Sequence, residues 1–162
     1  MTTTHRLERT YPTTPWTIWS LWTTPVGIAR WWSPDGFTTT VDTLDLREGG
    51  ELVYTMTATA AEAIAFMSSA GMPLSTISRK RFTRVDEPSA LAYQSQVDFV
   101  PGHEPYEFST EIELTATGAG TRVVMLVEPL HDELWTRRLL DGRANELDNL
   151  ARVVGSPPAP EA

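Results

Sequence analysis

The strongest constraint on the fold is a run of strand-like segments that short turns separate. Six segments carry the alternating apolar pattern or the β-branched and aromatic residues of strands. They span residues 37–46, 51–57, 76–85, 90–99, 106–116 and 121–128. Because connections this short join neighbouring antiparallel strands, the run predicts an antiparallel sheet.

Helical segments precede, interrupt and follow this run. After a first strand at 5–11, a short helix is expected at 15–22, with Pro15 in its first turn, and a second at 26–32 after Pro25 interrupts the first. Alanine-rich residues 58–70 predict an inserted helix, and residues 132–154 predict a long one. Strands and helices that are segregated in this way favour an α+β fold, with helices on one face of a curved sheet of about six or seven strands.

Length and composition indicate one domain of an ordinary globular kind. Residues 1–154 are predicted to form it, and the proline-rich tail, 155–162, is expected to be disordered. A net charge of -8 argues against nucleic acid and anionic membranes as partners. The sequence has no secretory signal pattern and no apolar run of about 18 residues, so we expect a soluble, cytoplasmic protein.

Motifs for familiar catalytic chemistry are absent from the sequence. It has no cysteine, no Gly-x-Ser-x-Gly nucleophile motif and no glycine-rich phosphate loop. Its histidines, His5, His103 and His131, lack the spacing of a zinc-binding helix. We therefore expect no metal, no cofactor and no catalytic residues, although His103 with Glu104, or His131 with Asp132, are candidates for acid–base chemistry.

Three stretches resemble one known family. They are TTPWTIWSLWTTPVGIARWWSPDGF at 13–37, DLREGGELVYTM at 45–56 and GAGTRVVMLVE at 118–128. Together they resemble the family named for the activator of the heat-shock-protein-ninety ATPase, within the START, polyketide-cyclase and pollen-allergen-like (SRPBCC) superfamily. The resemblance covers roughly 5–154 and implies a helix-grip fold, in which the sheet wraps around the long C-terminal helix and leaves a cavity.

The last helix departs from the family pattern at one position. Where the family commonly carries a Gly-Trp pair, this sequence has Gly142 and Arg143. At 100° per residue, the apolar side chains of the helix spread over about 140° of arc, and Arg143 falls in the middle of it. An unpaired buried charge is costly. Arg143 is therefore expected either to send its guanidinium to water or a structural carboxylate, or to bind the carboxylate, phosphate or carbonyl of a ligand.

The cavity walls are predicted from residues that share a face of their strands, together with residues of the second short helix, the candidate lid and the long helix. The predicted lining residues are Trp32, Tyr54, Met56, Phe66, Tyr93, Ser95, Val97, Phe108, Thr110, Leu139 and Arg143. Of the adjacent tryptophans, Trp31 is expected to pack into the core against the first helix, and Trp32 to border the cavity. The inserted helix is a candidate lid, dimer contact or cover for the sheet rim. The basic cluster Arg79-Lys80-Arg81 with Arg84 is expected to place alternate members on opposite sides of a strand, with two or more cations on a solvated outer face.

The leading functional hypothesis is non-catalytic binding of a small hydrophobic or amphipathic ligand in the cavity, for carriage, sensing or sequestration. Two alternatives remain open. One is a chaperone-regulating protein–protein interaction, which the family name suggests. The other is a cyclase- or hydrolase-type enzyme that uses the same cavity to polarise a carbonyl group. A homodimer is also compatible with the resemblance.

Overall fold

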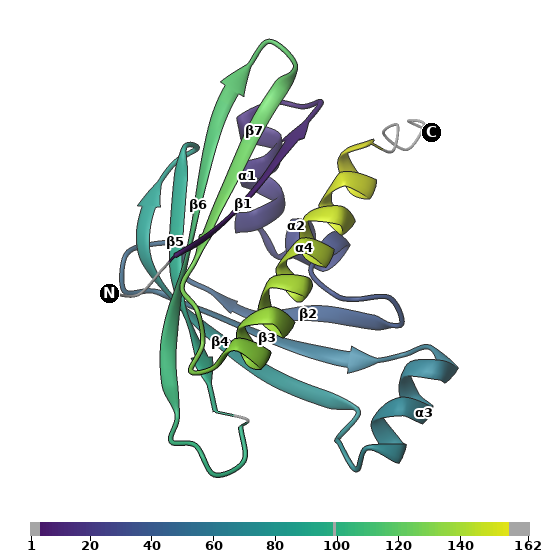
Figure 1. Ribbon diagram of the computed structural model, residues 1–162. Helices are drawn as coiled ribbons and strands as arrows, with labels where there is room; N and C mark the ends of the chain where they lie inside the picture. Colours follow the sequence, from purple (N-terminus) through teal and green to yellow (C-terminus); the bar gives the residue numbers. More distant parts are fainter. Residues whose placement is uncertain (1–3, 99, 156–162) are drawn as a thin grey trace.

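The computed structural model describes residues 4–98 and 100–155 as a curved antiparallel sheet that wraps around one long helix (Figure 1). In chain order the elements are β1 (His5–Tyr11), α1 (Pro15–Thr23), α2 (Pro25–Trp31), β2 (Phe37–Leu44), β3 (Glu51–Ala58), α3 (Ala61–Ser69), β4 (Ser75–Asp86), β5 (Ala90–Val97), β6 (Tyr106–Thr117), β7 (Gly120–Val127) and α4 (Glu133–Gly155). The predicted order of strands and helices is confirmed. Of the predicted tail, Gly155 ends α4, and residues 156–162 lie outside the described residues.

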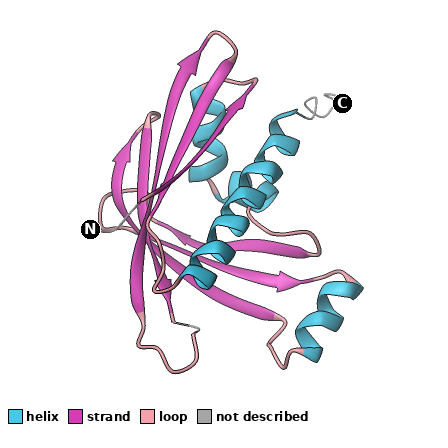
Figure 2. Ribbon diagram, in the orientation of Figure 1, coloured by secondary structure: helices cyan, strands magenta, loops and turns pink. Residues whose placement is uncertain are grey.

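All seven strands form one sheet in the order β1-β7-β6-β5-β4-β3-β2. Every neighbouring pair is antiparallel, and all but β1 with β7 join strands that are consecutive in the chain. Helices α1, α2 and α4 lie on the same side of this sheet (Figure 2). The helix-grip fold predicted from the resemblance is therefore confirmed.

Side-chain caps explain where the helices begin. The hydroxyl of Thr14 accepts a hydrogen bond from the Thr17 amide at the start of α1, and that of Thr24 accepts one from Gly27 at the start of α2. At the start of α4, the Asp132 carboxylate accepts from the Trp135 amide at 2.8 Å. The two short helices pack closely because a Cβ atom on Gly27 would collide with the backbone of α1.

The tryptophan pair at the end of α2 forms a corner of the core. The Trp31 indole N–H donates to the Leu21 carbonyl oxygen at 2.7 Å, and its ring packs edge-on against Trp22 with the centroids 4.6 Å apart. Trp31 thus packs into the core against α1, as predicted. The Asn149 side chain of α4 donates to the carbonyl oxygen of Trp31 at 3.3 Å, so the C-terminal half of α4 is fastened to this corner.

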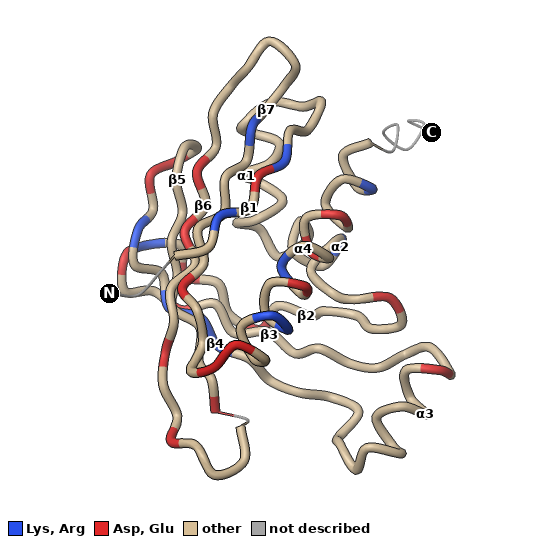
Figure 3. The backbone as a smooth tube through the Cα atoms, in the orientation of Figure 1, with Lys and Arg blue, Asp and Glu red and all other residues tan. Residues whose placement is uncertain are grey.

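The inserted helix α3 lies beyond the ends of β3 and β4 (Figure 1). It buries Ala63 and Met67 in a small cluster of its own, while Phe66 is 64% exposed. Between residues 59 and 78 the only charged residue is Glu62, so this region is almost entirely tan in Figure 3. In the part of the chain that the structure describes, no helix is long and apolar enough to cross a membrane.

Candidate functional site

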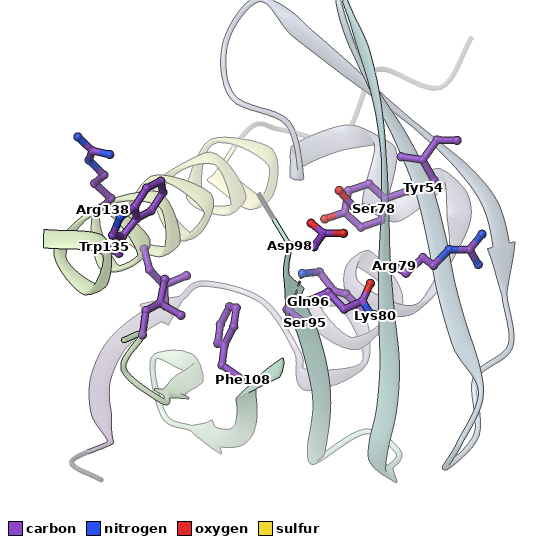
Figure 4. A pocket seen from close by; sticks show the side chains of 13 residues that line it. Tyr54, Ser78, Arg79, Lys80, Ser95, Gln96, Asp98, Phe108, Trp135 and Arg138 are labelled. Carbon is purple, nitrogen blue, oxygen red and sulfur yellow. Dashed lines mark hydrogen bonds between the residues drawn. The ribbon is translucent and has the colours of Figure 1, made fainter. Parts of the chain in front are cut away.

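A cavity of about 560 Å³ lies between strands β3 to β6 and the N-terminal half of α4. Figure 4 shows Trp135 and Arg138 of α4 on one side of it, with Tyr54 and Ser78 from the strands on the other. Its volume falls within the range of small-molecule sites, which combine apolar walls with a few polar groups. The walls here fit that description, with Phe108 and Trp135 among the apolar groups and several hydroxyl and charged groups beside them.

Strand alternation brings one cation of the basic cluster to the cavity. Arg79 and Arg81 lie exposed on the outer face, where they pair with Glu51 at 3.5 Å and Glu107 at 3.3 Å. Lys80, between them, points to the opposite face because successive side chains of a strand alternate. It is only 7% exposed and lines the cavity. The solvated outer face expected for two or more of these cations is therefore correct for the arginines, and Lys80 lies on the opposite side, as the alternation predicts.

The Lys80 amine is enclosed by aromatic rings. Its Nζ donates to the Ser95 hydroxyl at 2.8 Å, and it forms no ion pair with any residue that the structure describes. The amine lies 5.9 Å from the ring centroids of Trp32 and Tyr54 and 5.2 Å from that of Tyr93. Attraction between the cation and the rings partly offsets the loss of hydration, but no counter-ion balances the charge.

Burial therefore shifts the protonation equilibrium of this amine. Burial is the largest cause and the positive charge of Arg143 adds to it, while Glu146 opposes the shift; together they lower the pKa of Lys80 from 10.5 to about 7. At neutral pH a substantial fraction of the Lys80 amines is therefore uncharged, whereas an exposed lysine is almost fully protonated.

Arg143 lies within the core beside this site. It is 5% exposed, its Nη1 contacts the Glu146 carboxylate at 3.0 and 3.2 Å, and its Nη2 donates to the Thr110 hydroxyl at 3.2 Å. Burial by itself lowers the pKa of Arg143, but the charge of Glu146 opposes this and carries the pKa above its ordinary value. The guanidinium does not reach bulk water. The guanidinium carbon lies 5.7 Å from the centroid of the Phe108 ring, behind the cavity wall. Contact between Arg143 and a ligand therefore stays a prediction.

The predicted lining residues fall into three groups. Tyr54, Ser95, Phe108 and Leu139 line the cavity. Outside the lining lie Trp32 and Tyr93, which pack around the Lys80 amine, and Arg143 with its partner Thr110. The buried Val97 and the half-buried Met56 are also outside the lining. Phe66 is directed to solvent on α3, away from the cavity lining.

Sequence reasoning missed Lys80, although a signal was present. The sequence has thirteen basic residues other than histidine, and Lys80 is the only lysine among them. It also shares its strand face with Ser78 and the buried Phe82. Because side chains alternate along a strand, Lys80 must point inward once Phe82, two residues further on, is assigned to the core.

The candidate acid–base histidines meet at the surface. His103 and His131 have ring centroids 4.3 Å apart, and the Tyr106 hydroxyl lies 2.6 Å from His131 Nδ1. Their neighbours Glu104 and Asp132 are exposed. Among residues 4–98 and 100–155, no cluster of three or more histidine, aspartate or glutamate side chains could hold a metal ion.

Comparisons with known proteins show which family model the chain matches and which solved structures share its fold. A family model described as activator of Hsp90 ATPase homolog 1-like protein matches residues 12–155. No curated protein matches the sequence significantly. A solved protein of Chromobacterium violaceum superposes with a TM-score of 0.74 at 20% identity, covering 95% of this chain and 98% of that one. An AHSA1-like protein of Aeromonas hydrophila also gives 0.74 at 20% identity, over 94% and 92% of the two chains. At these identities the likeness shows the fold alone.

Proposed function

The chain belongs to the family of activator of Hsp90 ATPase homolog 1-like proteins, and we propose that it binds a small amphipathic ligand with an acidic or carbonyl end in its cavity. The observation that carries the proposal is the Lys80 amine in the cavity wall, buried without a carboxylate partner among the described residues. The family fits a ligand-binding fold, but a fold of this kind serves many functions, so the argument rests on this site.

A ligand of this kind would supply the counter-charge and the hydrogen-bond acceptors that the buried Lys80 amine lacks among the described residues. A buried amine loses its hydration, and the Ser95 hydroxyl replaces only one of the three hydrogen bonds that a charged amine can donate. A carboxylate would supply both a counter-charge and further acceptors. The apolar remainder of the ligand would contact Phe108, Leu139 and Trp135.

Such binding needs no catalytic step and is compatible with carriage, sensing or sequestration of the ligand. Lys80 would anchor the polar end, while Arg143 stays paired with Glu146 behind the wall. We expect a homodimer or a chaperone partner, if either forms, to use other surfaces than this cavity.

The direct test uses 2-naphthoate, an apolar ring system with one carboxylate, and measures its affinity by calorimetry. We expect the variant Lys80→Met to bind about tenfold more weakly or worse, since a buried hydrogen bond to a charged group contributes about 1.5–3 kcal/mol. For the wild-type protein, affinity should fall between pH 6 and pH 9, because the amine loses its charge as pH passes its pKa of about 7.

The matched control is Arg81→Met, which removes a neighbouring cation that is exposed on the outer face and is not among the cavity-lining residues, and it should leave affinity unchanged. Equal affinities for wild type and Lys80→Met would refute the anchoring role of Lys80. Native mass spectrometry of the protein purified from its own host would then identify the molecule that the cavity carries.

A further inference from the structure

Lys80 differs chemically from every other basic residue in the sequence. The other twelve cations are arginines, whose guanidinium groups stay protonated and do not act as nucleophiles. A lysine amine that loses its proton is a nucleophile for carbonyl carbon. The only side chain of this kind lies in the wall of the cavity, where a ligand can reach it, rather than on the surface.

The surroundings of Lys80 favour the uncharged amine. Three aromatic rings exclude water from Nζ, and the nearby Arg143 disfavours a second positive charge. Desolvation and a neighbouring cation are the two conditions that activate a lysine for Schiff-base formation. Among the other titratable groups, Glu146 of α4 faces the amine and opposes this effect, whereas Tyr54 and Tyr93 stay neutral because burial raises the pKa of each.

From this geometry we propose that Lys80 captures an aldehyde or ketone ligand covalently, as a reversible Schiff base in the cavity. The proposal rests on the proposed function, because the carbonyl compound must first enter the same cavity. The ligand would then carry a reactive carbonyl group, either instead of an acidic group or in addition to one.

The step needs no oxidant, reductant or cofactor. The lone pair of Nζ attacks the carbonyl carbon, a C–N bond forms, and the electron pair of the C=O π bond moves to oxygen. The nitrogen loses a proton and the oxygen gains one, and the Ser95 hydroxyl, 2.8 Å from Nζ, can relay that proton. The carbinolamine then takes up a second proton on its hydroxyl group and loses water, which leaves a protonated C=N bond. Addition of water reverses the sequence and releases the ligand.

The test is reductive trapping of the full chain at pH 7 with sodium cyanoborohydride and either 2-naphthaldehyde or the small aldehyde propanal. Peptide mass spectrometry then locates the secondary amine that forms. The chain contains one side-chain amine, so its α-amino group is the internal reference. We expect Lys80 to be modified faster than the α-amino group in the folded protein. In guanidinium chloride the preference should reverse, because the amine of an unfolded chain has an ordinary lysine pKa of about 10.4.

Two further arms separate the possible outcomes. An excess of 2-naphthoate should slow trapping at Lys80 and leave the α-amino group unaffected, and Lys80→Arg should abolish side-chain modification while circular dichroism stays unchanged. Modification of the α-amino group alone, with both aldehydes, would overturn the proposal. If 2-naphthoate still binds in a Lys80-dependent manner, only the covalent step fails. If neither 2-naphthoate nor an aldehyde engages Lys80, the proposed function fails with it.

Discussion

The two halves of α4 meet very different surroundings. Its C-terminal half packs against the tryptophan corner, where Leu147 and Leu150 are fully buried and the Tyr11 hydroxyl donates to the Leu147 carbonyl oxygen at 2.8 Å. Its N-terminal half stands off from the sheet and borders the cavity with Trp135 and Leu139 (Figure 4). One helix therefore closes the core at one end and leaves a binding volume at the other.

The difference shows how the same residue types serve stability and binding. In the corner, polar groups such as the Trp31 indole and the Asn149 amide fasten elements to one another. Buried groups without a hydrogen-bond partner among the described residues occur in both regions, namely the Trp19 and Trp22 indole nitrogens, the Tyr93 hydroxyl and the Arg143 Nε. What distinguishes the cavity end is Lys80, a buried cation that lines the cavity and has no counter-ion among the described residues, which is costly for folding and can be compensated by a ligand.

The largest expected effect is the difference in lost stability between a substitution in the tryptophan corner and one at the cavity end. Trp31→Ala removes a fully buried ring from the corner and should lower the free energy of unfolding by about 3–5 kcal/mol. Leu139→Ala removes a half-buried side chain that already borders empty volume, so its cost should stay near 1 kcal/mol. Urea unfolding of both variants measures the contrast, and equal losses would mean that the cavity end is packed as tightly as the corner.

The second prediction concerns the pH dependence of stability at the cavity end. Below pH 7 the Lys80 amine is protonated in the folded and unfolded chains, so the full cost of burying its charge is present. Between about pH 7 and pH 10 the unfolded chain holds a proton that the folded chain has lost. The contribution of Lys80 to stability should therefore rise with pH by up to about 1.4 kcal/mol per unit.

The variant Lys80→Met isolates this contribution. It should be more stable than wild type at pH 6, and its advantage should shrink steadily toward pH 10. Above that, stability should fall with pH in both proteins, because burial raises the pKa values of Tyr54 and Tyr93 and the unfolded chain loses these protons first. Urea titrations across this range, with the outer-face variant Arg81→Met as the matched control, provide the measurement. A constant difference between Lys80→Met and wild type would show that the amine titrates normally.

The smallest effect is expected outside both regions, on α3. Phe66 is exposed and lies away from the cavity, so Phe66→Ser should change the free energy of unfolding by less than about 0.5 kcal/mol. It should also leave 2-naphthoate affinity unchanged. A clear loss of affinity would instead support the lid that the sequence suggested for residues 58–70.

Local patterns were sufficient to predict the elements but only part of the site. Helical periodicity placed Arg143 on the apolar face of α4, and its burial follows from that. Its partner Glu146 is three residues further along, a spacing that brings the two side chains together on a helix, yet the sequence analysis did not pair them. Phe66 was assigned to the cavity because it is apolar and lies in a helix, but no local pattern says what a helix face will meet.

The sequence by itself determined the order of strands and helices, the family and the central position of Arg143, because these depend on periodicities of two and of about 3.6 residues within single segments. Only the tertiary structure decided where volume remains between α4 and the sheet, and that the Lys80 amine borders it. Those features depend on how β4 pairs with β5 and on how far α4 lies from both strands. The second of these involves residues that are far apart in the chain. The chemistry of the site therefore comes from one lysine whose burial the fold imposes.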